Sequence, residues 1–169
     1  KFNSTFSAIP NILSIPAGLF DDCVNAQEFA STFELLNIST VPERLFAKCV
    51  KATFFRGTFR QSHVTTVPGN VFENCRAIEN VSSCFENCSW ITSLPEMWNT
   101  SLYPKIKAYN AFAKNCNKAS NYSAVPPAWK YIPDSMKSRQ GRDIQELRYI
   151  PVLPPPSCAM PADHPVRVL

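Results

Sequence analysis

The sequence is poor in glycine, in long apolar runs and in net charge. Only 4 Gly occur among 169 residues, which argues against a glycine-rich loop that cradles phosphate groups. No run approaches the roughly 18 consecutive apolar residues that a membrane-spanning helix needs, so no membrane insertion is expected. The formal net charge of +4 is too small to indicate nucleic acid as a partner.

Residues suited to metal binding or catalysis are also scarce. The chain has two histidines, His63 and His164, and Cys84-x3-Cys88 has no second ligand pair with which to build a zinc site. Calcium would need closely alternating carboxylates, which the sequence lacks. Neither histidine stands in a context that marks it as the base for a Ser or Cys nucleophile. We therefore predict no metal, no cofactor and no catalysis.

A repeat of 26 residues runs through most of the chain. Prolines, cysteines and phenylalanines recur at this spacing, at Pro16, Pro42 and Pro68, at Cys23, Cys49 and Cys75, and at Phe33, Phe59 and Phe85. The aligned copies are SIPAGLFDDCVNAQEFASTF (14–33), TVPERLFAKCVKATFFRGTF (40–59), TVPGNVFENCRAIENVSSCF (66–85), a shifted fourth copy (93–112) and a fifth that begins with AVPPAW (124–129). FNSTF (2–6) matches the end of a copy, so we expect the first half of that repeat to lie before Lys1.

Each copy predicts a short strand followed by one helical turn. Thr and Val favour a pleated, half-buried surface, and proline ends the strand and opens the turn. Repeats of this size cannot close a core alone, but stacked neighbours share one. We predict an α/β fold, a leucine-rich-repeat-like solenoid of about five coils over residues 1–130. The residues predicted to stack inside it are Phe20, Phe46, Phe72 and Trp98.

The pattern I-T-x-I-P-x-x-L-F-x-x-C-x-x-V-x-x-F-x-x-T-F resembles the BspA-like leucine-rich repeats, over residues 2–130. That family occurs in surface and secreted proteins of Bacteroidetes and some protists, and related arrays occur in phage fibre proteins. The resemblance implies a curved solenoid used for adhesion or recognition. The fourth copy departs from the pattern, because it is stretched and lacks the Cys that ends the Leu-Phe turn (99–101).

The 7 cysteines are an odd number, so at least one is unpaired within the chain. The three in the repeat column point the same way, which is poor geometry for disulfides, and we interpret them as small buried apolar residues. A Cys88–Cys116 bridge between adjacent coils stays open as an alternative. Cys158 is the residue expected to be a free or intermolecular thiol.

Residues 131–169 form a segment without repeats. Residues 130–169 hold 7 of the 15 prolines, which predicts an extended, polyproline-like end. Two interpretations stay open. The segment either covers the open end of the solenoid, or it is an arm that docks the chain to a partner or into a homo-oligomer.

Binding residues of a repeat array are expected where positions vary between copies while the scaffold positions hold. The column five residues before the proline is polar or amphipathic, and it reads Asn11, Asn37, His63, Trp90 and Asn121. An exposed Trp90 beside His63 would be an anchor for a carbohydrate or a protein surface. The predicted ligand-binding residues are Glu34, Asn37, Arg60, Gln61, His63 and Trp90.

These observations predict an extracellular, non-catalytic recognition or adhesion module. Its partner would be a protein or a glycan on another surface, and its place a bacterial cell surface or a phage fibre. The alternative is a structural component of a virion or surface assembly. In that case the solenoid is a spacer or docking scaffold and the C-terminal segment mediates assembly.

Overall fold

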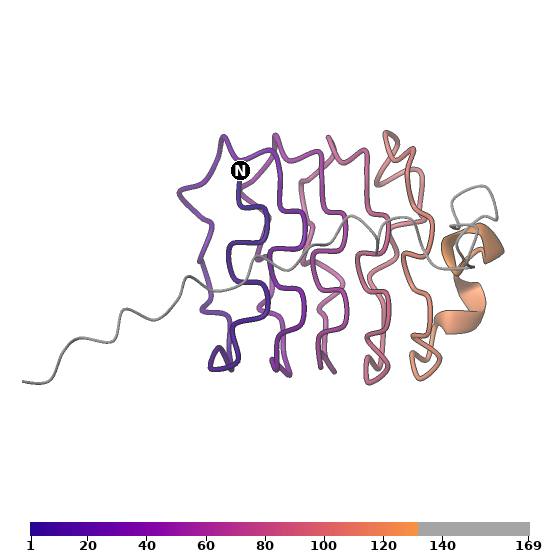
Figure 1. Ribbon diagram of the computed structural model, residues 1–169. Coiled ribbons are helices and arrows are strands. Elements are labelled where there is room, and N and C mark those ends of the chain that lie inside the picture. The colour runs from indigo at the N-terminus through magenta and orange to yellow at the C-terminus, as the bar shows by residue number, and fades with distance from the viewer. Residues whose placement is uncertain (132–169) are drawn as a thin grey trace, which may run out of the picture. The chain divides into compact units, whose positions relative to one another are not determined.

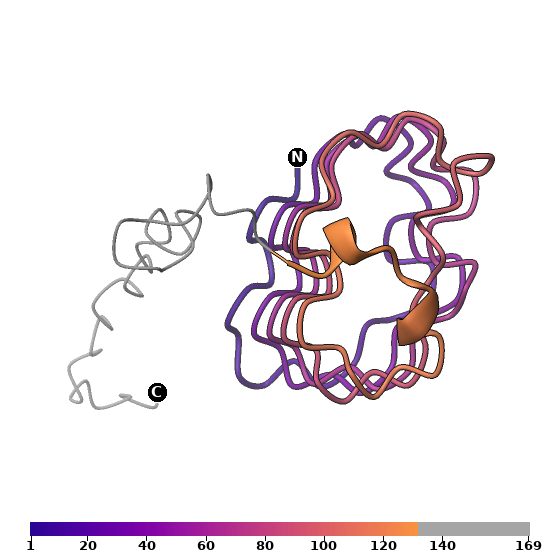
Figure 2. The same ribbon diagram turned by 90° about the vertical axis from the view of Figure 1, so that its right-hand side faces the viewer.

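The computed structural model describes residues 1–131, which lie within the compact unit Lys1–Asp134. The chain follows the same path several times, so that successive passes form layers of a stack (Figure 1). Viewed end-on, the layers superpose closely (Figure 2). Apart from Tyr131, the predicted C-terminal segment (131–169) lies outside the described residues. No helix in the described part could cross a membrane.

Main-chain hydrogen bonds join each layer to the next through one set of segments, which we call the ladder segments. They are residues 2–8, 28–35, 54–61, 80–87 and 108–114. The amide of Phe29 donates to the carbonyl of Phe54, that of Ser31 to Arg56, and so on at every second residue. Each junction has four such bonds, with N···O distances of 2.8–3.0 Å, and every amide donates toward the C-terminal end of the stack.

The prediction of an α/β solenoid of five coils is wrong. Residues 1–131 contain no α-helix and no strand, and they are largely irregular. β-pairing is limited to the isolated parallel bridges Glu28↔Phe54, Thr40↔Thr66, Phe54↔Asn80 and Asn80↔Ala108. The helical elements are two 3-10 helices, η1 (Tyr122–Ala124) and η2 (Pro127–Trp129). A parallel β-ladder exchanges bonds in both directions between two strands. In the ladder segments only the first residues, Phe54, Asn80 and Ala108, donate back to the preceding layer, and the four regular bonds of each junction all run the other way.

Residues in the left-handed conformation form the corners of the ladder segments. They come in pairs four residues apart: Ser4 and Ala8, Ser31 and Leu35, Gly57 and Gln61, Ser83 and Asn87, and Ala111 and Asn115, with φ between 51° and 62°. Such residues break the extended pleat, which prevents a continuous strand. The conformation costs a residue with a Cβ about 1–2 kcal/mol, and only Gly57 is free of that cost.

The core consists of phenylalanine columns that run along the stack. The prediction that Phe20, Phe46 and Phe72 lie one above the next is confirmed, since their ring centroids are 5.5 and 5.4 Å apart and nearly parallel. A second column contains Phe59 and Phe85, at 5.3 Å. Offset aromatic pairs of this kind contribute about 0.5–1.5 kcal/mol each beyond the buried area. The columns therefore stabilise every junction between layers.

The C-terminal end of the described stack differs from the prediction. Trp98 does not continue the phenylalanine column, but packs edge-on against Trp129 with ring centroids 6.4 Å apart. The predicted fifth copy, from residue 124, forms η2 instead of a further layer. Trp129 is buried and stacks on Tyr109 at 4.8 Å. The fifth copy therefore covers the core rather than extending it.

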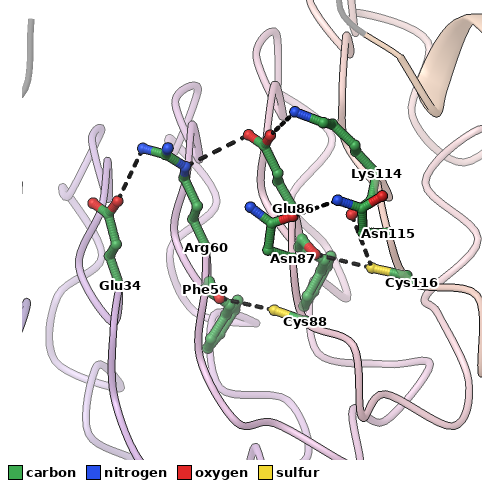
Figure 3. A network of polar contacts seen from close by, with 10 residues as sticks. Glu34, Phe59, Arg60, Glu86, Asn87, Cys88, Lys114, Asn115 and Cys116 are labelled. Carbon is green, nitrogen blue, oxygen red and sulfur yellow. Dashed lines mark hydrogen bonds and ion pairs between the residues drawn. The ribbon is translucent and has the colours of Figure 1, made fainter. Parts of the chain in front are cut away.

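Side-chain donors bind the carbonyl groups of the buried phenylalanines from the next layer. The Cys88 thiol donates to the carbonyl of Phe59 at 2.9 Å, and Ser62 donates to the carbonyl of Phe33 from the equivalent position one layer earlier. Figure 3 shows the Cys88 and Cys116 contacts. Cys88 and Cys116 are free thiols rather than a disulfide.

We expect Leu35→Asn to stabilise the protein. Leu35 has a φ of 60° and is 43% exposed, so its side chain gains little from burial. Asn tolerates this backbone region, and it already occupies the equivalent positions in two later layers, Asn87 and Asn115. The free energy of unfolding should rise by about 1 kcal/mol, measured by denaturant titration. Leu35→Val should lower it, and equal effects of the two variants would contradict the explanation.

We expect Cys88→Ser to be tolerated far better than Cys88→Val. Serine keeps a donor for the Phe59 carbonyl, as Ser62 does for Phe33. Valine fills the space but removes one of the two donors to the Phe59 carbonyl, which keeps its bond from the Ser62 N–H, at a cost of about 0.5–1.5 kcal/mol. Thermal unfolding of the two variants measures the difference. If valine proved the more stable replacement, the thiol would act by packing alone.

Candidate functional site

An exposed strip of side chains crosses successive layers beside the ladder segments. Main-chain bonds fix its register, since Thr65 donates to the carbonyl of Ser39, Thr92 to Thr65 and Ser120 to Thr92, at 2.8–2.9 Å. Ser39, Thr65, Thr92 and Ser120 are therefore equivalent in successive layers, and so are the residues two positions before them. They are Asn37, His63, Trp90 and Lys118, all exposed, and we call them the recognition strip.

Trp90 is the largest side chain of the recognition strip. It is 53% exposed and takes no part in the hydrophobic core. The Lys118 ammonium nitrogen lies 3.5 Å from the centroid of its ring, an arrangement that contributes about 0.5–1 kcal/mol at an exposed site. The contact orients the indole and leaves much of its surface open to solvent. The predicted anchor is therefore placed outward, as binding requires.

His63 and Asn37 form a pair in the same strip. The Nδ1 atom of His63 lies 3.0 Å from Oδ1 of Asn37. Asn121, which the sequence column placed with them, lies elsewhere. Its amide nitrogen donates to the carbonyl of Leu94, and its amide oxygen accepts from the Leu94 N–H. Asn121 thus has a structural role, and Lys118 holds the position that was predicted for it.

Polar, uncharged side chains flank the recognition strip on both sides. One row presents hydroxyls, from Ser39, Thr65, Thr92 and Ser120. The other presents amides, from Gln61, Asn87 and Asn115, after Leu35 in its first layer. The Asn115 amide donates to Asn87 Oδ1 at 2.7 Å, which aligns the two. Residues 35–39, 61–65, 87–92 and 115–120 contain no Asp or Glu. The face is therefore free of carboxylates.

Two of the predicted ligand-binding residues, Glu34 and Arg60, lie inside the stack instead. They belong to a row of alternating charges that runs through four layers, Glu34, Arg60, Glu86 and Lys114 (Figure 3). Arg60 pairs with Glu34 at 3.2 Å and with Glu86 at 3.5 Å, and Lys114 pairs with Glu86 at 2.7 Å. Gln61, the neighbour of Arg60, points outward and is half-buried. We call this row the charge ladder.

Burial dominates the electrostatics of the charge ladder. The Glu34 and Glu86 side chains are 1% and 0% exposed, and Arg60 is 11% exposed. Burial raises the pKa of Glu34 above its ordinary value of 4.5, and a hydrogen bond from Ser31 and the charge of Arg60 offset part of that rise. The ladder is thus a costly arrangement that persists because each carboxylate has a cation beside it.

The fully buried thiols are unsuited to nucleophilic chemistry. Burial raises the pKa of Cys49, Cys75 and Cys116 to about 12, so they carry almost no thiolate at neutral pH. Within residues 1–131 no three His, Cys, Asp or Glu side chains gather closely enough to hold a metal ion.

Two hollows lie away from the recognition strip. One of about 300 Å³ is lined by Asn70, Glu73, Arg76 and Tyr103, but Glu73 is paired with Arg44 and the Arg76 guanidinium donates to main-chain carbonyls. The other, of about 250 Å³, is apolar and lies in the first layers. Neither contains a residue that the sequence predicted to bind a ligand.

We expect Glu86→Gln to destabilise the protein strongly. Arg60 and Lys114 would then lose the carboxylate that both contact. Breaking a buried pair costs about 3–5 kcal/mol, and because Lys114 stays 32% exposed we expect the lower end of that range. Denaturant unfolding measures the loss. Glu79→Gln is the control, since its pair with Lys107 is exposed and should contribute less than about 1 kcal/mol.

A scan against protein-family models finds no match for this chain, and neither does a search of the curated proteins. The resemblance to the BspA-like repeat pattern therefore depends on the sequence positions alone. The function is argued from the side chains that the layers present to solvent.

Proposed function

We propose that this protein is an extracellular, non-catalytic recognition module that binds a protein or glycan through the recognition strip. The observation that carries the proposal is Trp90, an indole that is 53% exposed, outside the core and held in place by Lys118. Exposed aromatic side chains with a fixed orientation are frequent anchors of binding surfaces. The bacterial cell surface and the phage fibre are both compatible with this role.

The scaffold beneath the strip supports the proposal. Each strip residue lies three or four positions after a member of the charge ladder, in a layer joined to its neighbours by main-chain bonds. Binding surfaces held by well-ordered elements lose less conformational entropy when a partner docks. The buried residues hold the stack together, so the exposed residues of the same layers can differ in type from one layer to the next.

We expect Trp90→Ala and His63→Ala to leave the fold intact and to weaken binding. The test is an array of purified glycans and extracellular proteins, probed with the labelled full chain and with each variant. Loss of an anchor residue should lower the affinity for the bound member about 30-fold for Trp90→Ala, with less effect for His63→Ala. Thermal unfolding should be unchanged for both.

Two outcomes would contradict this role. If both variants lowered the unfolding temperature sharply, Trp90 and His63 would be packing residues and the binding site would lie elsewhere. If no array member bound, and deletion of residues 132–169 abolished assembly of the chain into a larger particle, the structural alternative would replace recognition. A Lys48→Gln variant, an exposed site on another part of the layer, controls for a general effect of surface substitution.

A further inference from the structure

We infer that the recognition strip binds an acidic polysaccharide, laid along the stack so that successive sugar rings meet successive layers. This inference deepens the proposed function and rests on it. It depends on three features of the face: the kinds of side chain, their spacing and their charge.

The kinds of side chain match a sugar rather than an apolar surface. Amides and hydroxyls, such as those of Asn115 and Ser120, can bond to vicinal sugar hydroxyls as both donors and acceptors. The open part of the Trp90 indole offers a flat apolar surface for the C–H face of a pyranose ring. The Thr65 and Thr92 hydroxyls donate to the carbonyls of the preceding layer at 2.9 Å, which leaves their lone pairs facing outward as acceptors.

The spacing of the layers suits a polymer. Main-chain hydrogen bonds join the layers directly beside the strip, and chain segments bonded in this way lie about 4.7–4.9 Å apart, near the distance between successive rings in an extended polysaccharide. Equivalent strip residues therefore recur at nearly the repeat distance of such a chain. A ligand that crosses four layers, from Asn37 to Lys118, would place one ring at each layer.

The charge of the face favours an acidic ligand. The strip and its flanking rows contain no carboxylate, and the nearest ones, Glu34 and Glu86, are buried and paired inside the charge ladder. Lys118 forms no ion pair within the part of the chain that the structure describes, and its ammonium group lies over the Trp90 ring, 3.5 Å from the ring centroid. A uronate carboxylate beside the open part of the indole would lie within reach of that group.

The experiment uses the full chain, with galacturonate, its linear tetramer and the methyl-esterified tetramer as probes in isothermal titration. The tetramer should bind, the ester at least tenfold more weakly because its charges are removed, and the monomer more weakly still. Lys118→Gln should lower the affinity for the acidic tetramer about tenfold, a change of about 1.4 kcal/mol, and that for the ester by a smaller factor, because the variant also loses the contact that orients Trp90. Lys48→Gln should change neither, and added salt should weaken binding of the acidic tetramer.

Several results would overturn the inference, and they are distinguishable from failure of the proposed function. Equal affinity for tetramer and ester would remove the role of charge. Equal affinity for monomer and tetramer would remove the alignment along the stack, and equal, Lys118-dependent binding of polyglutamate would point to an acidic peptide. If no saccharide bound while Trp90→Ala abolished binding to a protein on the array, recognition would stand and the ligand class would be wrong. If neither Trp90→Ala nor Lys118→Gln changed the affinity for the bound ligand, the strip would be the wrong site for both proposals.

Discussion

The one-directional hydrogen bonds between ladder segments are the constraint on which the rest of the structure depends. Buried amide and carbonyl groups must find partners, and in this fold every second amide of a ladder segment finds its partner in the next layer. The C-terminal end of the stack must therefore supply carbonyls. The Trp129 and Tyr131 carbonyls do so, accepting from Ala113 and Ala111 at 3.1 and 2.9 Å. The turn through η2 and the packing of Trp129 over the core both follow from this requirement.

The sequence predicted the apolar columns but not the backbone that carries them. Phe20, Phe46 and Phe72 share a residue type and a spacing, so their stacking could be inferred without a backbone model. The strand and helix assignments failed because the strand propensity of Thr and Val and the helix-opening tendency of proline describe single segments, whereas the direction of bonding is a property of two layers. The left-handed corners at Ser31 and Leu35 could not be predicted from their residue types, because Ser and Leu are not typical of that conformation. Asn87 and Asn115, which are typical of it, could have indicated the second corner column.

The exposure of the recognition strip was predicted in part, for a related reason. Asn37, His63 and Trp90 point outward as expected, and the residue that follows each of them is apolar and buried. Glu34 and Arg60 were assigned to the same surface, but alternation along the ladder segment turns them inward and their neighbours outward. Lys118 was missed since the distance between equivalent residues lengthens from 26 to 28 in the later layers. Counting back from Pro126 therefore reached Asn121 instead.

The charge ladder gives the stack an order that the apolar columns cannot give. Equivalent core positions such as Phe46 and Phe72 hold the same residue type, so the phenylalanine columns alone would stabilise any arrangement of the layers. The ladder alternates in sign, and exchanging two neighbouring layers would bring Glu34 and Glu86 together as buried like charges, at a cost well above one aromatic contact. Buried ionic groups that specify register act in this way in coiled coils. Because each strip residue follows its ladder charge by three or four positions, the buried charges also help to hold Asn37, His63, Trp90 and Lys118 in register on the surface.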